Sequence, residues 1–233
     1  MDFSARSAAT EWMDTEAVSA DDFARCLADL ATVNTLTLAR PPTLGFMRRV
    51  ARRLPAGASL RVLDVGFGEG DMLRRIARWG RRRLLPLELE GVDLNPASTE
   101  AAEAATPPEA GIRFRTGDVF DETAGRFDVV ISSLFTHHLT DAELVRFLRW
   151  MEETAGRGWF INDLHRHPAA YYGFAALARA AGWHRFVQHD GPVSVARAFQ
   201  RPDWERVLAE AGLLGVARIR WHMPFRLCVS RLR

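Results

Sequence analysis

One short stretch constrains the fold of this chain more than any other. Residues 60–65, LRVLDV, are mostly apolar and lead into glycines at three alternate positions: Gly66, Gly68 and Gly70. Apolar residues then recur at helical spacing from residue 71, with arginines between them. The pattern predicts a strand, a tight turn and a helix, because glycine turns sharply and leaves room beside the main chain. Such a turn at the carboxyl end of a parallel strand is typical of a small-molecule site.

A dinucleotide-binding turn is the competing interpretation. Its fingerprint, G-x-G-x-x-G, would place a third glycine at residue 71, where this chain has Asp71. A carboxylate there would repel the pyrophosphate that the helix N-terminus has to receive. The turn therefore favours a cofactor without phosphates.

Three later segments read as strands that end at polar side chains. Residues 87–93 end at Asp93, residues 112–116 lead to Asp118, and residues 127–133 end at Ser133. An ionised carboxylate can accept hydrogen bonds from both hydroxyls of a ribose, so Asp93 is a candidate ligand for a nucleoside. It could also cap the helix that Pro96 opens. Further strands are predicted at residues 159–164, 214–221 and 225–230.

Together, these motifs resemble those of the class I S-adenosylmethionine-dependent methyltransferases. The first motif of that family is similar to the stretch from Asp64 to Gly70, and the end of its third strand is similar to Gly117-Asp118-Val119. The resemblance covers about residues 60–232. It implies an α/β, Rossmann-like fold: a mostly parallel seven-stranded sheet with a C-terminal antiparallel hairpin, N-terminal helices and a lid insertion. Phe67 departs from the family, which usually has a small or polar residue there, and this predicts altered packing around the methionine moiety.

The resemblance also implies S-adenosylmethionine as the cofactor, with Asp118 and Val119 at the adenine. The expected cofactor-binding residues are Asp64, Gly66, Gly68, Asp93, Leu94, Asp118, Val119 and Ser133.

Two segments outside this core predict a cover over the acceptor. Residues 1–57 have helical spacing and form an N-terminal helical cap, with Ser19 and Asp22 similar to a helix-capping pair; residues 58–233 form the methyltransferase domain. Residues 165–198, within that domain, are rich in aromatic residues and histidine and are interpreted as a lid. The adjacent Tyr171 and Tyr172 are the candidate substrate-binding residues. These aromatic residues could equally pack a small satellite core.

The insertion carries a narrower resemblance. Residues 163–167, 169–174 and 189–192 are similar to small-molecule methyltransferases found with type III polyketide and phenolic-lipid pathways, a branch similar to the quinone-biosynthesis methyltransferases. We therefore expect an enzyme that methylates a phenolic, quinol-like or polyketide-derived small molecule, most simply at oxygen. Methylation at carbon by proximity, or a non-catalytic binding module, are the alternatives. The complete set of cofactor-binding residues argues against the binding module.

A phenolic acceptor calls for a general base, and the chain contains no lysine. Histidine is then the natural candidate near neutral pH. His138 and His165 follow the fourth and fifth strands and are the expected catalytic residues, although either could be structural. Asp163, His165 and His167 alternate along an extended segment and could be read as metal ligands. We expect no metal.

Composition limits the partners and the compartment. The formal net charge is +2, and arginines are interspersed with acidic residues, which differs from the clustered basic stripe of a nucleic-acid-binding protein. No apolar run is long enough to span a bilayer, and no secretory signal is visible. Cys26 and Cys228 are expected to be reduced. These features predict a cytoplasmic enzyme with a small-molecule acceptor, and they leave the oligomeric state open.

Overall fold

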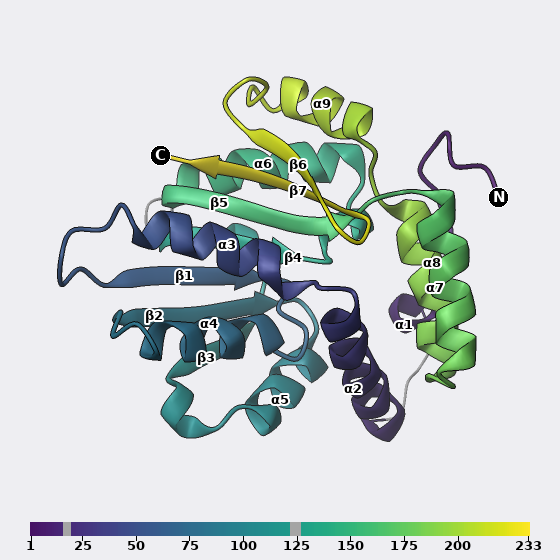
Figure 1. Ribbon diagram of the computed structural model, residues 1–233, viewed down its shortest axis with the longest axis horizontal. Helices are drawn as coiled ribbons and strands as arrows, with labels where there is room; N and C mark the ends of the chain where they lie inside the picture. Colours follow the sequence, from purple (N-terminus) through teal and green to yellow (C-terminus); the bar gives the residue numbers. More distant parts are fainter. Residues whose placement is uncertain (16–19, 122–126) are drawn as a thin grey trace.

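The computed structural model describes residues 1–15, 20–121 and 127–233, so Ser19 and its expected capping role lie outside the described residues. Its central feature is a seven-stranded sheet in the order β3-β2-β1-β4-β5-β7-β6 (Figure 1). The strands are β1 (Leu60–Val65), β2 (Leu87–Asp93), β3 (Ile112–Thr116), β4 (Phe127–Ser133), β5 (Ala155–Leu164), β6 (Arg218–His222) and β7 (Arg226–Leu232). The first five are parallel, and β7 pairs antiparallel with both β5 and β6. This confirms the expected mostly parallel sheet with a C-terminal antiparallel hairpin.

The last three strands differ from their predicted bounds. The fifth strand starts at residue 155 rather than 159, because helix α6 (Asp141–Thr154) passes directly into it. The sixth starts at residue 218 rather than 214, because residues 213–217 form a turn in which Gly215 has a φ of 87°. The seventh continues to Leu232, where it still pairs with β5.

Helices cover both faces of the sheet. α3 (Arg40–Ala51) and α4 (Asp71–Arg81) lie on one face, and α6 and α9 (Arg201–Glu210) lie on the other (Figure 1). α5 (Pro96–Ala105) packs beside β3 at one edge of the sheet. Each face has its own hydrophobic core, so the middle strands β1 and β4 carry apolar side chains on both sides, as buried parallel strands do.

α3 belongs to the sheet rather than to the other N-terminal helices. Pro41 and Pro42 lie in its first turn, where the absence of an N–H removes no helical hydrogen bond. Phe46 is fully buried and stacks on Phe160 of β5, with ring centroids 5.0 Å apart. The side-chain amide of Asn162, also on β5, donates to the Ala39 carbonyl just before the helix.

Four other helices form a separate group, which we call the cap: α1 (Trp12–Thr15), α2 (Ala20–Leu36), α7 (Pro168–Ala180) and α8 (Arg185–Arg197). Figure 1 shows them beyond the end of the sheet toward which the parallel strands point. Their own small core contains Cys26, Val33, Ala178, Trp183, Phe186 and Val187. Several aromatic residues of the predicted lid thus pack a satellite core between the N-terminal helices and the insertion. No helix in the described part of the chain is long and apolar enough to cross a membrane.

Candidate functional site

The glycine turn lies between β1 and α4, and all three of its glycines have positive φ. Gly66, Gly68 and Gly70 have φ values of 70°, 56° and 74°, a region that side chains with a Cβ rarely adopt. A Cβ on Gly66 would lie 2.8 Å from the Phe135 ring, and one on Gly70 would lie 2.6 Å from the Phe114 ring. A Cβ on Gly68 would meet nothing within 4 Å. Packing therefore explains two of the glycines, whereas Gly68 leaves open space above the turn.

Phe67, the residue that departs from the family pattern, points into the core. It is 7% exposed, and its ring centroid lies 5.0 Å from that of Phe114. Gly91 on β2 makes room for it, since a Cβ there would lie 2.6 Å from the Phe67 ring. Phe67 thus packs between α4 and the sheet.

Asp93 ends β2 and fastens the glycine turn to the sheet. One of its carboxylate oxygens accepts a hydrogen bond from the Gly68 N–H at 3.0 Å, and the other accepts from the Asn95 N–H at 3.0 Å. Burial raises the pKa of Asp93, against these hydrogen bonds and the nearby His138, which lower it. The N-cap of α5 is Asn95, whose side chain accepts from the Ala97 N–H, so capping does not account for Asp93.

The end of β3 lies beside Asp93. The Gly117 N–H donates to the Asp93 carbonyl at 2.9 Å. Asp118 accepts from the Phe120 N–H at 2.9 Å and shapes the short helical turn η2 (Val119–Asp121). Val119 is 8% exposed, whereas Leu94 is 68% exposed, a high value for a leucine beside a glycine-rich turn.

Two of the expected cofactor-binding residues carry buried polar atoms without a partner. Asp64 is 2% exposed, and its Oδ1 accepts no hydrogen bond from the described residues. Burial, and then the neighbouring carboxylates of Asp93 and Asp71, raise its pKa well above the usual value. The Ser133 hydroxyl at the end of β4 is likewise without a hydrogen-bond partner among the described residues. Leaving a buried polar group unpaired is costly, so these atoms are suited to receive a polar ligand.

A buried histidine–aspartate pair lies at the ends of β4 and β5. His137 is in the turn η3 (Thr136–His138), and its Nδ1 lies 2.7 Å from Asp163 Oδ1. The other Asp163 oxygen accepts from the Thr136 hydroxyl at 2.5 Å and from the His137 N–H at 3.0 Å. Burial alone would raise the pKa of Asp163, but the charge and hydrogen bond of His137 and the bond from Thr136 lower it to about 2. An ionised Asp163 holds the His137 ring in one orientation and leaves Nε2 facing away from it.

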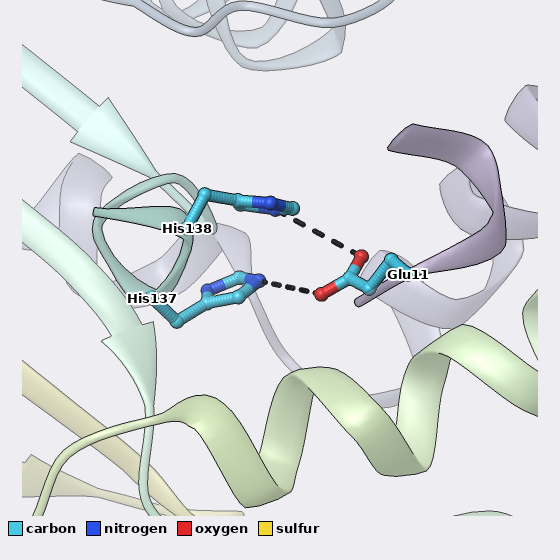
Figure 2. A group of neighbouring side chains, drawn as sticks. All are labelled: Glu11, His137 and His138. Atoms are coloured by element: carbon cyan, nitrogen blue, oxygen red, sulfur yellow. Dashed lines mark ion pairs between the residues drawn. The ribbon is translucent and has the colours of Figure 1, made fainter. Parts of the chain in front are cut away.

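Glu11, from the N-terminal segment, faces both histidines of this turn (Figure 2). Its Oε1 lies 3.6 Å from His137 Nε2, and its Oε2 lies 3.9 Å from His138 Nε2. Glu11 is 7% exposed, and its Oε1 accepts a hydrogen bond from the Ser194 hydroxyl of α8 at 2.8 Å. Nothing in the sequence linked Glu11 to this site, because it precedes the first core strand by about 50 residues.

Two arginines hold the turn in place. Arg6 donates to the carbonyls of His137 and Leu139 and pairs with Asp141 at 2.9 Å. Arg197, at the end of α8, donates to the His137 and His138 carbonyls at 3.3 and 3.2 Å. The turn is thereby joined to both the N-terminal segment and the cap.

His165 and His167 lie apart from this group. His165 follows β5 and is half-buried; its Nδ1 has no hydrogen-bond partner among the described residues. Burial, and then the neighbouring His167 and Arg166, lower the pKa of His165. His167 Nδ1 accepts from the Ala169 N–H as the N-cap of α7. The reading of Asp163, His165 and His167 as metal ligands was wrong, because Asp163 turns to His137 and His167 caps a helix.

Tyr171 and Tyr172, the expected substrate-binding residues, lie in the first part of α7. Both rings pack edge-on against Phe3, with centroid distances of 5.5 and 6.2 Å. Tyr172 is 57% exposed. Arg166, which precedes α7, is fully buried. It donates to the Phe3 carbonyl at 3.0 Å and fixes this end of the N-terminal segment.

Comparisons with known proteins agree with this geometry. Residues 62–158 match the family model of a methyltransferase domain. A stretch of 121 residues is 34% identical to a ubiquinone biosynthesis O-methyltransferase of Azorhizobium caulinodans, covering 47% of this chain and 44% of the relative. The match thus spans less than half the length of that curated relative.

Solved structures show the same fold. The magnesium protoporphyrin IX methyltransferase of Synechocystis PCC 6803, solved with bound SAH, is 16% identical; it aligns over 95% of this chain and 90% of its own, with a TM-score of 0.52. The CMeT domain of the citrinin polyketide synthase is 13% identical over 80% of this chain and 50% of its own, with a TM-score of 0.58.

Proposed function

We propose that the chain transfers a methyl group from S-adenosylmethionine to a small molecule, because residues 62–158 match the family model of a methyltransferase domain and the fold is similar to that of a methyltransferase solved with SAH. The acceptor atom is a hydroxyl oxygen of a phenolic, quinol-like or polyketide-derived compound. The observation that carries this is the His137–Asp163 pair, which lies at the same edge of the sheet as the glycine turn and Asp93.

The donor would be held at the ends of β1, β2, β3 and β4. The cofactor supplies a methyl group already activated on a sulfonium. Asp64 has an unpaired buried oxygen to pair with the ammonium of its methionine part, and Gly66 and Gly68 let that part approach the main chain. Asp93 has carboxylate lone pairs left for the ribose hydroxyls.

The adenine would be bound at the adjacent strand ends. Asp118 is the acceptor for the adenine amino group and the Val119 N–H is a donor to the ring. Leu94 is exposed where an apolar ring face would cover it, and Ser133 offers its unpaired hydroxyl at the end of β4.

His137 is the best-placed general base in this site. Asp163 fixes its Nδ1, so the lone pair of Nε2 is available to take the proton of the acceptor hydroxyl. Phenols ionise near pH 10, so a base poised near neutrality lowers the cost of forming the nucleophile. His138 and His165, the candidates from the sequence, are the alternatives. We place the acceptor under the cap, which includes α7 and α8 of the 165–198 insertion, with Tyr171 and Tyr172 at the rim of its site. The division between residues 1–57 and 58–233 stays a proposal, and α3 of the first part packs on the sheet of the second.

Methylation at carbon is the second candidate. The favoured oxygen acceptor follows the similarity to an O-methyltransferase of ubiquinone biosynthesis, whereas the similarity to a polyketide synthase CMeT domain supports carbon. Transfer to carbon would use the same donor site and place an enolate carbon near His137.

Two measurements test the proposal. Calorimetry compares S-adenosylmethionine, its demethylated product and NAD; tighter binding of NAD would contradict the donor site. Incubation with methyl-labelled donor and a panel of phenols and quinols, followed by mass spectrometry, then identifies the methylated atom. Donor binding without transfer to any acceptor would favour the non-catalytic binding module.

A further inference from the structure

Glu11, His137 and His138 form a group with the geometry of metal ligands. Each contributes one ligand atom, and these three atoms lie within 4.8 Å of one another. Figure 2 shows the two rings side by side, with the carboxylate facing both ring edges. The His137 and His138 ring centroids are 4.4 Å apart, so both rings point out of the same turn. Among the described residues, this is the group that brings three such atoms together.

The separations suit a cation better than direct hydrogen bonds. The carboxylate oxygens lie 3.6 and 3.9 Å from the two Nε2 atoms, beyond the roughly 2.7–3.2 Å of an N–H···O bond. Ligand atoms held about 2.0–2.2 Å from a tetrahedral zinc ion lie roughly 3.4 Å from one another. A small inward movement of the side chains would place all three at bonding distance from one ion.

The residues around Glu11, His137 and His138 also favour a metal site. Metal-bound histidines commonly donate their second ring N–H to a carboxylate, and ligating carboxylates are themselves hydrogen-bonded. His137 has Asp163 at its Nδ1, at 2.7 Å, and Glu11 accepts from the Ser194 hydroxyl. Arg6 and Arg197 donate to backbone carbonyls of the turn, so the backbone that carries the two histidines is held without an ion.

We propose that Glu11, His137 and His138 bind one divalent cation of the zinc class, with two imidazole nitrogens and one carboxylate as ligands. The sequence alone gives no reason to bring Glu11 to this turn. Three protein ligands leave a fourth coordination position, which water can occupy.

The consequence for catalysis rests on the proposed function. The ring of His137 has one lone pair once Asp163 holds its Nδ1–H, so Nε2 cannot hold the ion and accept the acceptor proton at the same time. Occupation by zinc therefore inhibits methyl transfer, and a chelator restores it. The N-terminal segment, which carries Glu11, is in this way a regulator of the base.

The binding test uses the tag-free, chelator-treated full chain and Co²⁺ as the probe. The expected result is saturable binding of one Co²⁺ with ligand-field absorption in the visible range, displaced by Zn²⁺. Glu11→Gln should weaken the affinity by more than about 100-fold. Asp163→Asn, which changes the hydrogen bond to His137 without removing a ligand, should weaken it by about 10–100-fold. Glu205→Gln, at a half-exposed carboxylate on α9, is the matched control and should bind Co²⁺ as the parent protein does. Absence of saturable binding, or unchanged binding in Glu11→Gln, overturns the site.

The inhibition test is separate. With an acceptor identified, Zn²⁺ should suppress turnover of the parent protein, whereas the turnover of Glu11→Gln, compared with its own zinc-free rate, should resist the same Zn²⁺ concentration. Full turnover of the parent at saturating Zn²⁺ overturns the competition between ion and base. Should the chain methylate no acceptor, the proposed function fails, but the cobalt titration still decides whether the ion site exists.

Discussion

The sheet and the cap differ in how far apart along the chain their contacts originate. Each residue of the proposed donor site lies at or near the end of a strand, within a short motif around Gly66, Asp93, Asp118 or Ser133. The cap core instead joins Cys26 of α2 to Trp183 and Phe186 of the insertion, more than 150 residues away. The difference teaches that one end of this molecule is built from local motifs on a rigid sheet, and the other from distant segments that meet only in the folded chain.

The N-terminal segment shows how the cap reaches the site. The backbone N–H groups of Trp12 and Met13 donate to the Asp190 carboxylate of α8, and the Trp12 ring stacks on His189 at a centroid distance of 3.7 Å. These contacts place Glu11, the preceding residue, against His137. The comparison therefore predicts that donor binding depends on the sheet alone, and that turnover depends on both parts.

The largest expected effect comes from His137→Ala. If proton removal limits the rate, turnover should fall by ~10²–10⁴-fold with donor affinity nearly unchanged, because the ring acts on the acceptor. Steady-state kinetics on the identified acceptor and calorimetry with the donor measure the two quantities. His138→Ala and His165→Ala are the controls; a comparable loss in either one, with His137→Ala active, would move the base to that residue.

The second prediction uses the same substitution in the two cores. Phe46 in the sheet core is 0% exposed and Phe186 in the cap core is 1% exposed. Phe46→Ala should lower the free energy of unfolding by ~3–5 kcal/mol, as large cavities do. Phe186→Ala should loosen the cap locally, so that the KM for the acceptor rises while the Kd of the donor stays the same.

Urea unfolding, followed by donor calorimetry on both variants, makes this comparison. Loss of donor binding in Phe186→Ala under native conditions would show that the cap and the sheet are one cooperative unit. The prediction that donor binding depends on the sheet alone would then be wrong.

The third prediction concerns the donor end alone. Asp93→Ala should weaken donor binding by ~1.5–3 kcal/mol, since it removes charge-assisted hydrogen bonds to the ligand. It also releases the Gly68 N–H, which now bonds to the carboxylate. Glu88→Ala, at an exposed position on the same strand, is the control, and calorimetry is the measurement. Equal donor affinity in Asp93→Ala and the parent protein would remove this residue from the donor site.

The smallest expected effect comes from alanine at a glycine with positive φ, and it separates backbone strain from contact with the donor. Gly68 and Gly57 both have positive φ, 56° and 77°, and neither would meet another atom within 4 Å of an added Cβ. Alanine at either position should cost about 1–2 kcal/mol of stability, the cost of a left-handed backbone. Only Gly68→Ala should also weaken donor binding, because its Cβ would enter the space above the turn. Thermal unfolding and calorimetry measure the two effects, and equal donor affinity in both variants would contradict the role of Gly68.

The sequence by itself determined the mostly parallel sheet with its C-terminal antiparallel hairpin, and it predicts the residues of the donor site. Glycines, strand-ending carboxylates and apolar periodicity are local signals, and parallel strands bring their carboxyl ends to one edge whatever the rest of the chain does. It also indicated that a histidine near the ends of β4 or β5 would matter.

Only the tertiary structure shows which histidine Asp163 contacts and what surrounds it. The sequence alone does not say whether Asp163 faces His137, His165 or His167. The direction of a side chain at the end of a strand depends on how the chain leaves the sheet. After β5 the chain continues into α7, whereas the Asp163 side chain contacts the η3 turn and orients His137. Glu11 reaches the same turn because Asp190 and the cap core hold the N-terminal segment there. These contacts join residues far apart along the chain, and no local pattern encodes them.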